Sequence, residues 1–294
     1  MMLRVLPIVM TAVVFAAAAA ELQTAEQIGD CHRGSVPDDS SVQTISMNAK
    51  DRIGAVTTSK ATIHWKKFDD GLSRVMMRFF KPPDLRGAGL LMVEKQARND
   101  MFIYLPELGR VKRITSRMTS ASMFGTDFSY EEFERLQGIA KSAPTTRAED
   151  GSVDGRPAYV LEVRPTSDSD SAYERIVTFI DKETCVQLRA EFYERGERAR
   201  KVLTANTSTL SQEGDAWLAR EYLMRDLRDE TETILVSDVE LNAIARHGID
   251  IYVGGDKLYR LVEFGMEEVE GMHSGVVRSL DGRDDRLVVG TDNG

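Results

Sequence analysis

The strongest constraint on the fold is a period-two alternation of apolar and polar residues, which recurs along the chain between short turn-like segments. The clearest case is residues 186–192, VQLRAEF, which would place apolar side chains on one face of a strand and polar side chains on the other. The same period predicts strands at residues 72–79, 158–164 and 231–239. A sheet that buries one face is therefore expected.

The segments between these strands have the composition of tight turns, with Asp-Gly, Arg-Gly or Glu-Gly pairs. Hairpin-like connections are predicted at residues 69–71, 149–151, 153–157, 194–196 and 212–215. Parallel strands would need long crossovers, so strands joined by short turns indicate an antiparallel meander. The expected fold class is mainly β.

One segment, residues 114–141, breaks the strand pattern and is rich in Met and Phe. Ser129 and Glu132 have the spacing of a helix capping box. They predict a short helix with Phe133 and Leu136 on one side. We interpret this segment as a lid over an apolar surface.

The N-terminus has the features of a cleaved signal peptide at residues 1–20. Arg4 precedes an apolar stretch that ends in three alanines, which satisfies the small-residue rule for cleavage. The stretch is shorter than the roughly 20 residues that cross a bilayer. Cys31 lies too far downstream to be acylated, so the mature chain is expected to be an exported, soluble protein that begins with a short helix at residues 21–33.

The chain has two cysteines, Cys31 and Cys185, which fit an oxidising compartment. A disulfide between them would tie the N-terminal segment to a central strand. Two separately buried thiols are the alternative, because sequence does not give their distance. A redox-active pair is disfavoured by the absence of a C-x-x-C spacing.

The residues that carry catalysis are largely missing. The sequence has no nucleophile elbow, phosphate-binding loop or dinucleotide fingerprint. Its four histidines are scattered and show no metal-ligand spacing: His32, His64, His247 and His273. The net charge of −9 argues against a nucleic-acid partner. We therefore expect no enzyme activity, no metal and no cofactor.

Binding of an apolar ligand is the remaining class of function. Such a site needs a water-excluding surface lined by adaptable side chains, and methionine suits that purpose. The chain has 13 methionines, and six of them cluster in one stretch: Met76, Met77, Met92, Met101, Met118 and Met123. Ordinary core packing is the alternative explanation for each of them.

Three blocks carry a resemblance to a known family: FFKPPDLRGAGLL at 79–91, YLPELGRVKRI at 104–114, and FGTDFSYE at 124–131. In this order and spacing the chain resembles the outer-membrane lipoprotein-sorting proteins of the LolA-like superfamily, from about Cys31 to Val239. The resemblance implies an unclosed antiparallel β-barrel, a half-barrel with short helices as a lid. It also implies an apolar cavity for acyl chains and a place in the periplasm.

Candidate site residues follow from the apolar blocks and from a basic edge beside them. The expected ligand contacts are Phe79, Leu91, Met92, Met118, Met123, Phe124, Phe128 and Phe133. Arg110, Lys112 and Arg113 would contact a headgroup or a partner. A solvated strand face is the alternative for these three cations.

The sequence-based hypothesis is a periplasmic carrier that binds a lipid or the acyl chains of a lipoprotein. Its expected partners are an inner-membrane exporter or an outer-membrane acceptor, and the protein is expected to be a monomer. The alternative is an envelope sensor of the RseB type, which binds lipoprotein or a partner protein without shuttling it. The expected domains are the signal peptide, a half-barrel at 21–245, and a partly disordered extension at 246–294 with one further strand at 258–264.

Overall fold

The computed structural model describes residues 21–35, 39–68, 70–166, 169–214 and 216–241, together with five short strands beyond them. These five strands are β17 (Val253–Gly254), β18 (Leu258–Val262), β19 (Gly265–Glu268), β20 (Val277–Arg283) and β21 (Arg286–Thr291). The predicted strand at 258–264 is confirmed as β18. The predicted signal peptide lies outside the described residues. No described helix is long and apolar enough to span a membrane.

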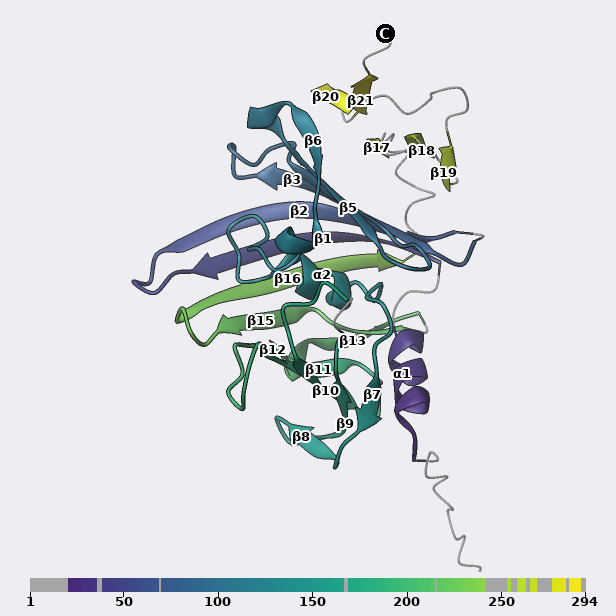
Figure 1. Cartoon of the computed structure of the whole chain (residues 1–294), viewed down its shortest axis with the longest axis vertical. Coiled ribbons are helices and arrows are strands. Elements are labelled where there is room, and N and C mark those ends of the chain that lie inside the picture. The colour runs from purple at the N-terminus through teal and green to yellow at the C-terminus, as the bar shows by residue number, and fades with distance from the viewer. Residues whose placement is uncertain are drawn as a thin grey trace, which may run out of the picture.

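A single antiparallel sheet of 14 strands dominates the described fold (Figure 1). Its first half is a meander of β1 (Ser40–Lys50), β2 (Val56–Lys67), β3 (Ser73–Lys81), β4 (Gly89–Val93), β5 (Asp100–Leu105) and β6 (Arg110–Arg113). Its second half contains β7 (Thr145–Arg147), β8 (Gly151–Val153), β9 (Arg156–Val163), β10 (Arg175–Asp181), β11 (Gln187–Tyr193), β12 (Lys201–Ala205), β15 (Glu221–Asp226) and β16 (Thr231–Leu241). A separate hairpin joins β13 (Leu210–Glu213) to β14 (Ala216–Ala219).

The two halves join through β1 and β16, which pair antiparallel along their length. The sheet order runs from β6 through β1 and β16 to β7, and these two edge strands do not pair with each other. The sheet is therefore not closed, and the predicted half-barrel is confirmed. Short helices accompany it: α1 (Ala25–Gly34), α2 (Tyr130–Leu136), η1 (Pro106–Leu108), η2 (Ser116–Met118) and η3 (Thr207–Thr209).

The predicted alternation is visible in the burial of the strands. In β16, Thr233 and Leu235 are buried, whereas Val236 between Leu235 and Ser237 is exposed. Leu235 pairs with Met47 of β1, and both belong to one core cluster. We call the face that carries this cluster the inner face of the sheet.

Most of the predicted turns join paired strands. At the β8–β9 turn, Asp154 and Gly155 both have positive φ angles, 49° and 80°, as a two-residue hairpin turn requires. The predicted hairpin at residues 149–151 is wrong. That turn connects β7 to β8, and both strands pair with β9 instead of with each other.

The chain crosses the inner face between β6 and β7, and α2 lies on this crossing segment (Figure 1). The crossing segment supplies Met123, Phe128, Phe133 and Ile139 to the core cluster. They pack against inner-face residues of the strands, among them Ile63, Met77, Phe79, Leu90 and Met92. The segment predicted to be a lid is thus part of the packed core in this structure.

Candidate functional site

A cavity of about 530 Å³ lies between α1, α2 and the inner face of strands β9 to β12. Its floor is apolar and comes from residues of these strands, including Leu161, Ile176, Ile180, Ala190, Phe192 and Leu203. Charged residues of the two helices and of the segment after α2 also line it: Glu26, Arg33, Glu132, Arg135 and Lys141. An apolar floor with charged groups beside it suits a ligand with an apolar body and a polar end.

Two smaller cavities share walls with this main cavity. One, of about 230 Å³, lies on the side of β5 and is lined by Asn99, Glu131 and Glu134. The other, of about 90 Å³, is lined by residues that include Trp65, Trp217 and Tyr222. Three cavities therefore surround α2.

Helix α1 forms one wall of the main cavity and begins at a capping box made by Thr24 and Gln27. Ile28 packs against Tyr159, Leu161 and Ile180 of the sheet. The predicted N-terminal helix is therefore confirmed, and its apolar residue faces the sheet.

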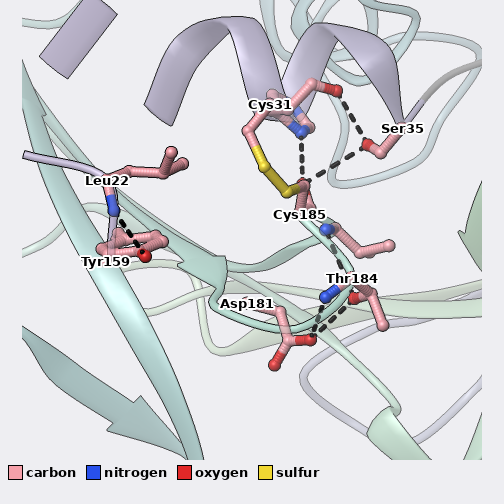
Figure 2. The surroundings of a disulfide bond; sticks show 9 residues. Leu22, Cys31, Ser35, Tyr159, Asp181, Thr184 and Cys185 are labelled. Atoms are coloured by element: carbon pink, nitrogen blue, oxygen red, sulfur yellow. Dashed lines mark hydrogen bonds between the residues drawn. A yellow bond between two sulfur atoms is a disulfide. The ribbon is translucent and has the colours of Figure 1, made fainter. Parts of the chain in front are cut away.

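The predicted disulfide between Cys31 and Cys185 is present and holds the C-terminal half of α1 on the sheet (Figure 2). The two Cα atoms lie 5.5 Å apart, within the usual range. His32 Nδ1 donates to the Cys185 carbonyl at 3.1 Å, and Ser35 Oγ donates to the same oxygen at 3.3 Å. Burial lowers the pKa of His32, so its ring is neutral near pH 7.

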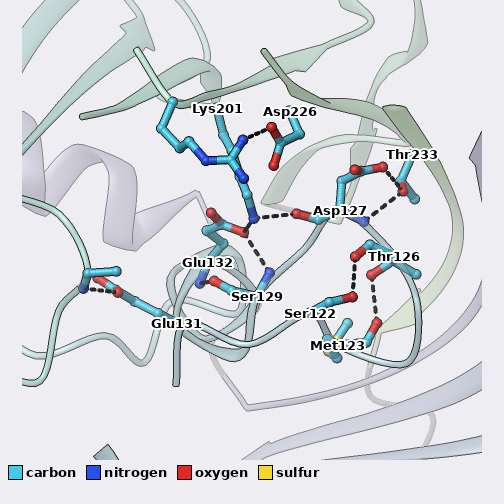
Figure 3. Close-up of polar contacts among 12 residues, drawn as sticks. Ser122, Met123, Thr126, Asp127, Ser129, Glu131, Glu132, Lys201, Asp226 and Thr233 are labelled. Carbon is cyan, nitrogen blue, oxygen red and sulfur yellow. Dashed lines mark hydrogen bonds and ion pairs between the residues drawn. The ribbon is translucent and has the colours of Figure 1, made fainter. Parts of the chain in front are cut away.

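Helix α2 is anchored through the carboxylate of Glu132, whose side chain has no exposed area (Figure 3). Its Oε2 atom accepts from the Ser129 backbone N–H at 2.6 Å, which completes the predicted capping box. The same oxygen accepts from Lys201 Nζ of β12 at 3.1 Å. Tyr173 donates its hydroxyl hydrogen bond to the other oxygen.

The loop before α2 is tied to the sheet by the same group of residues. Lys201 Nζ also donates to the backbone carbonyl of Asp127 at 2.6 Å. The Asp127 carboxylate accepts from the hydroxyls of Thr231 and Thr233 on β16. Side chains of two strands, β12 and β16, and of Tyr173 in the segment before β10 therefore meet at this network and fix the crossing segment on the inner face.

Glu134 lies on α2 beside the 230 Å³ cavity and accepts a hydrogen bond from Asn99 Nδ2 at 2.6 Å. Burial raises the pKa of Glu134 to about 7. The Asn99 hydrogen bond and the charges of Arg135 and Lys141 oppose this rise, and the charge of Glu131 adds to it. This carboxyl therefore titrates near neutral pH.

We expect Glu134 to make stability depend on pH. Its ordinary pKa is 4.5, so between pH 4.5 and 7 the native state holds a proton that the unfolded chain loses. The free energy of unfolding therefore falls as pH rises through this window. A Glu134→Gln variant keeps an acceptor for Asn99 and is expected to be more stable than the parent by about 1–3 kcal/mol at pH 8.

Urea unfolding of both proteins at pH 4 and pH 8 checks this expectation. Near pH 4 the two proteins should have closely similar free energies of unfolding, because Glu134 is mostly protonated in both the native and the unfolded state. His32 titrates identically in the two proteins and cancels from the difference. An equal difference at both pH values would contradict the assigned pKa.

The structure places the eight predicted ligand contacts away from these cavities. Phe79, Met92, Met123, Phe128 and Phe133 are packed in the core cluster, and Phe124 packs against Phe79 with ring centroids 4.5 Å apart and the rings tilted by 49°. Leu91 is buried on the opposite face from its neighbours Leu90 and Met92. Met118 is exposed. None of the eight lines the three cavities, and their role as ligand contacts stays a prediction.

The predicted basic edge forms strand β6 at one end of the sheet. Arg113 pairs there with Asp100 of β5, and Arg110 is exposed. Neither these two nor Lys112 lines the cavities, so their contact with a headgroup or partner also stays a prediction. Within the described residues, no group of three His, Cys, Asp or Glu side chains could hold a metal ion.

Sequence reasoning missed the residues that do line the main cavity. Ala190 and Phe192 belong to the strand with the clearest alternation, and their apolar face could have indicated them. Nothing local indicated Arg135 or Lys141, because they reach the cavity only through the position of α2 and the segment after it.

Comparison with known proteins identifies the family. Residues 71–246 match a protein-family model that is described as an uncharacterized protein. A DUF1329 family protein from Desulfovibrio piger has a similar structure, with a TM-score of 0.67 and 23% identity over 74% of this chain and 92% of that one. The chain belongs to the DUF1329 family.

Two further solved structures resemble this chain. A domain from Vibrio parahaemolyticus, named for outer-membrane lipoprotein sorting, has a TM-score of 0.65 and 26% identity over 74% of this chain and 91% of its own. A LolA superfamily protein from Nitrosomonas europaea has a TM-score of 0.59 and 17% identity over 75% and 94%. A search of curated proteins finds no match.

Proposed function

We propose that this LolA-like protein is a periplasmic carrier that binds a lipid, or the acyl chains of a lipoprotein, in the cavity between α1, α2 and β9 to β12. The observation that carries the proposal is the cavity itself. Its volume of about 530 Å³ falls in the roughly 300–1,000 Å³ range of small-molecule sites, and its floor is apolar. An exporter that delivers the lipid and an outer-membrane acceptor that takes it are the proposed partners.

The energetics of acyl binding support this choice of ligand. Each buried methylene contributes about 0.8 kcal/mol, so a chain of ten carbons would supply about 8 kcal/mol without any directed hydrogen bond. Part of this is offset by ordering the chain and the protein around it. An apolar floor therefore suffices to hold a lipid reversibly, as a carrier requires.

The disulfide and a similar solved structure also support the carrier proposal. The disulfide between Cys31 and Cys185 fits an oxidising compartment such as the periplasm. The Vibrio domain at 26% identity is named for outer-membrane lipoprotein sorting. Both agree with a carrier that works between the two membranes.

The direct test is lipid mass spectrometry on the protein purified under native conditions from bacterial periplasm. A lipid or acylated peptide at close to one molecule per protein is the expected result. If nothing co-purifies and no fluorescent acyl probe binds, the carrier proposal fails. A binding protein for a partner chain, such as an envelope sensor, would then be the better explanation.

Filling the cavity should abolish binding, and Gly29 of α1 offers a position for this. Gly29 lines the cavity, and a Cβ atom there would meet the Arg33 guanidinium group, the mobile end of a side chain, at 3.3 Å. We expect Gly29→Trp to lower bound lipid at least tenfold, because the indole would occupy the space of the acyl chain. Retained lipid, measured per mole of protein, is the readout.

Gly34 provides the matched control on the same helix. It ends α1, and a Cβ atom there would meet nothing within 4 Å. Replacing a helical glycine does not lower helix propensity, so neither variant should unfold α1. Gly34→Trp should keep its lipid, and equal losses in the two variants would argue against this cavity as the binding site.

A further inference from the structure

Arg135 of α2 is the one side chain common to the linings of all three described cavities. The main cavity with its apolar floor and the two smaller cavities therefore meet at this residue. Its side chain is 22% exposed, so the guanidinium group is largely withdrawn from bulk solvent. A ligand whose chain occupies the main cavity would bring its polar end toward this group.

The guanidinium group of Arg135 has unused hydrogen-bonding capacity. Its Nη2 atom donates to Glu131 Oε1 at 3.2 Å, across one turn of α2. Its Nε atom is buried and has no hydrogen-bond partner among the residues that the structure describes. A buried unpaired donor is unfavourable, so an acceptor supplied by a ligand would be stabilising.

Glu131 does not depend on Arg135 for its own hydrogen bonds. Its carboxylate also accepts from Ser171 Oγ at 2.5 Å and from the Ala172 backbone N–H at 3.0 Å. The guanidinium could therefore turn toward a ligand without leaving Glu131 without partners. Because Nε is the unpaired donor, it can also bond to an anion while Nη2 keeps its ion pair with Glu131.

Three cations line the main cavity: Arg33, Arg135 and Lys141. Arg33 pairs with the exposed Asp30, Lys141 pairs with Glu94 at 3.5 Å, and the carboxylate of Glu132 is engaged by Lys201. Glu26 is the other anion of this lining. A guanidinium group matches carboxylate and phosphate oxygens with two parallel hydrogen bonds, which a lone ammonium group cannot do.

We propose that Arg135 binds the anionic group of an amphiphilic ligand, the carboxylate of a fatty acid or the phosphate of a phospholipid, while the acyl chain occupies the cavity of β9 to β12. This inference rests on the proposed carrier function and narrows it. Acyl chains held only by ester and amide bonds, as at a lipoprotein terminus, have no such group. The ligand class is therefore an anionic lipid.

The test compares two fluorescent probes that share one acyl chain, a free fatty acid and its methyl ester. The wild-type protein is expected to bind the acid about tenfold more tightly than the ester. Arg135→Gln should remove this preference while leaving the affinity for the ester unchanged. Arg135→Lys should retain part of the preference, because it keeps the charge and loses the paired donors.

Arg225→Gln is the matched control, because it removes an exposed arginine from β15 that lines none of the cavities. It should leave both affinities unchanged. Displacement of the acid probe by lysophosphatidic acid or by unlabelled fatty acid, with monoacylglycerol as the uncharged comparison, distinguishes phosphate from carboxylate as the natural group.

Two results would overturn the inference while leaving the carrier proposal intact. One is an unchanged preference for the acid in Arg135→Gln, and the other is an equal loss of affinity for both probes. If neither probe binds to the wild-type protein, the carrier proposal itself fails. Circular dichroism of each variant confirms that α2 and the sheet are retained.

Discussion

The Lys201→Met variant is expected to lose about 3–5 kcal/mol of its free energy of unfolding. Lys201 Nζ bonds to Glu132 at 3.1 Å and to the Asp127 carbonyl at 2.6 Å. The side chain of Glu132 has no exposed area and that of Lys201 is 11% exposed. Removing the ammonium group would leave a buried carboxylate without its counter-charge, which costs far more than the loss of an exposed ion pair.

A second variant separates the charge from the packing. In Lys201→Met combined with Glu132→Gln, the buried charge is gone and the amide oxygen still accepts from Ser129 or Tyr173. We expect part of the lost stability to return, so the two changes should not be additive. Additive losses would show that the carboxylate is not the reason for the instability.

Arg225 on the neighbouring strand β15 is the matched control for Lys201. It forms an ion pair with Glu232, and its side chain is 59% exposed. Arg225→Met is expected to change the free energy of unfolding by less than about 1 kcal/mol, because exposed pairs contribute little. Urea unfolding of the variants under one set of conditions measures these differences.

Loss of the Cys31–Cys185 disulfide is the second change for which we expect a large effect. The bond joins residues separated by 154 positions, and restricting so long a loop in the unfolded chain stabilises the native state by about 4–5 kcal/mol in the chain-entropy account. Measured losses for native disulfides are typically about 2–5 kcal/mol. The Cys31→Ala, Cys185→Ala variant should therefore be less stable by an amount in this range.

The same variant should also retain less lipid, because α1 forms a wall of the main cavity and the bond holds it on the sheet. Without the disulfide, Ile28 and its apolar neighbours on the sheet still hold the helix, but less firmly. Lipid dissociation is therefore expected to become faster while the helix persists.

A reducing agent supplies the control for the disulfide. It should lower the unfolding midpoint of the wild-type protein toward that of the double variant and leave the variant unchanged. An identical midpoint for oxidised wild type and variant would contradict a stabilising role for the bond.

Helix α2 is held by the Glu132–Lys201 pair and also lines the main cavity. The network of Glu132, Lys201 and Tyr173 keeps α2 on the inner face, next to the cavity that α2 lines. The pKa of Glu134 on the same helix is about 7, so the stability of the packing of α2 against the sheet depends on pH near neutrality. If the proposed carrier function holds, we expect lipid binding and release to depend on this helix, because it carries Arg135.

The sequence by itself determined the elements that depend on local spacing. Alternation of apolar and polar residues specified strands such as β11 and β16, because a pleated strand places successive side chains on opposite faces. The Ser129–Glu132 capping box specified the start of α2. A turn such as Asp154-Gly155 specified a hairpin, because few residues adopt positive φ angles without strain.

Local spacing did not determine which apolar residues would pack in the core of the inner face and which would line a cavity. Met123, Phe128 and Phe133 belong to the core cluster of the inner face, and their role as ligand contacts stays a prediction. The turn at 149–151 had hairpin composition, yet both of its strands pair with β9. Packing and strand pairing between elements decided both arrangements, and the residues of a single segment do not specify these contacts.

Only the tertiary structure decided where the candidate binding cavity lies. The pairing of β1 with β16 joins the two meanders, and the crossing segment then covers one half of the inner face and leaves a cavity over the other. Lys201 meets Glu132 across 69 positions of sequence, and Arg135 reaches the cavities because that pair holds α2 in place. Alternation is a property of neighbouring residues, whereas a cavity is the space left between elements that pack from distant parts of the chain.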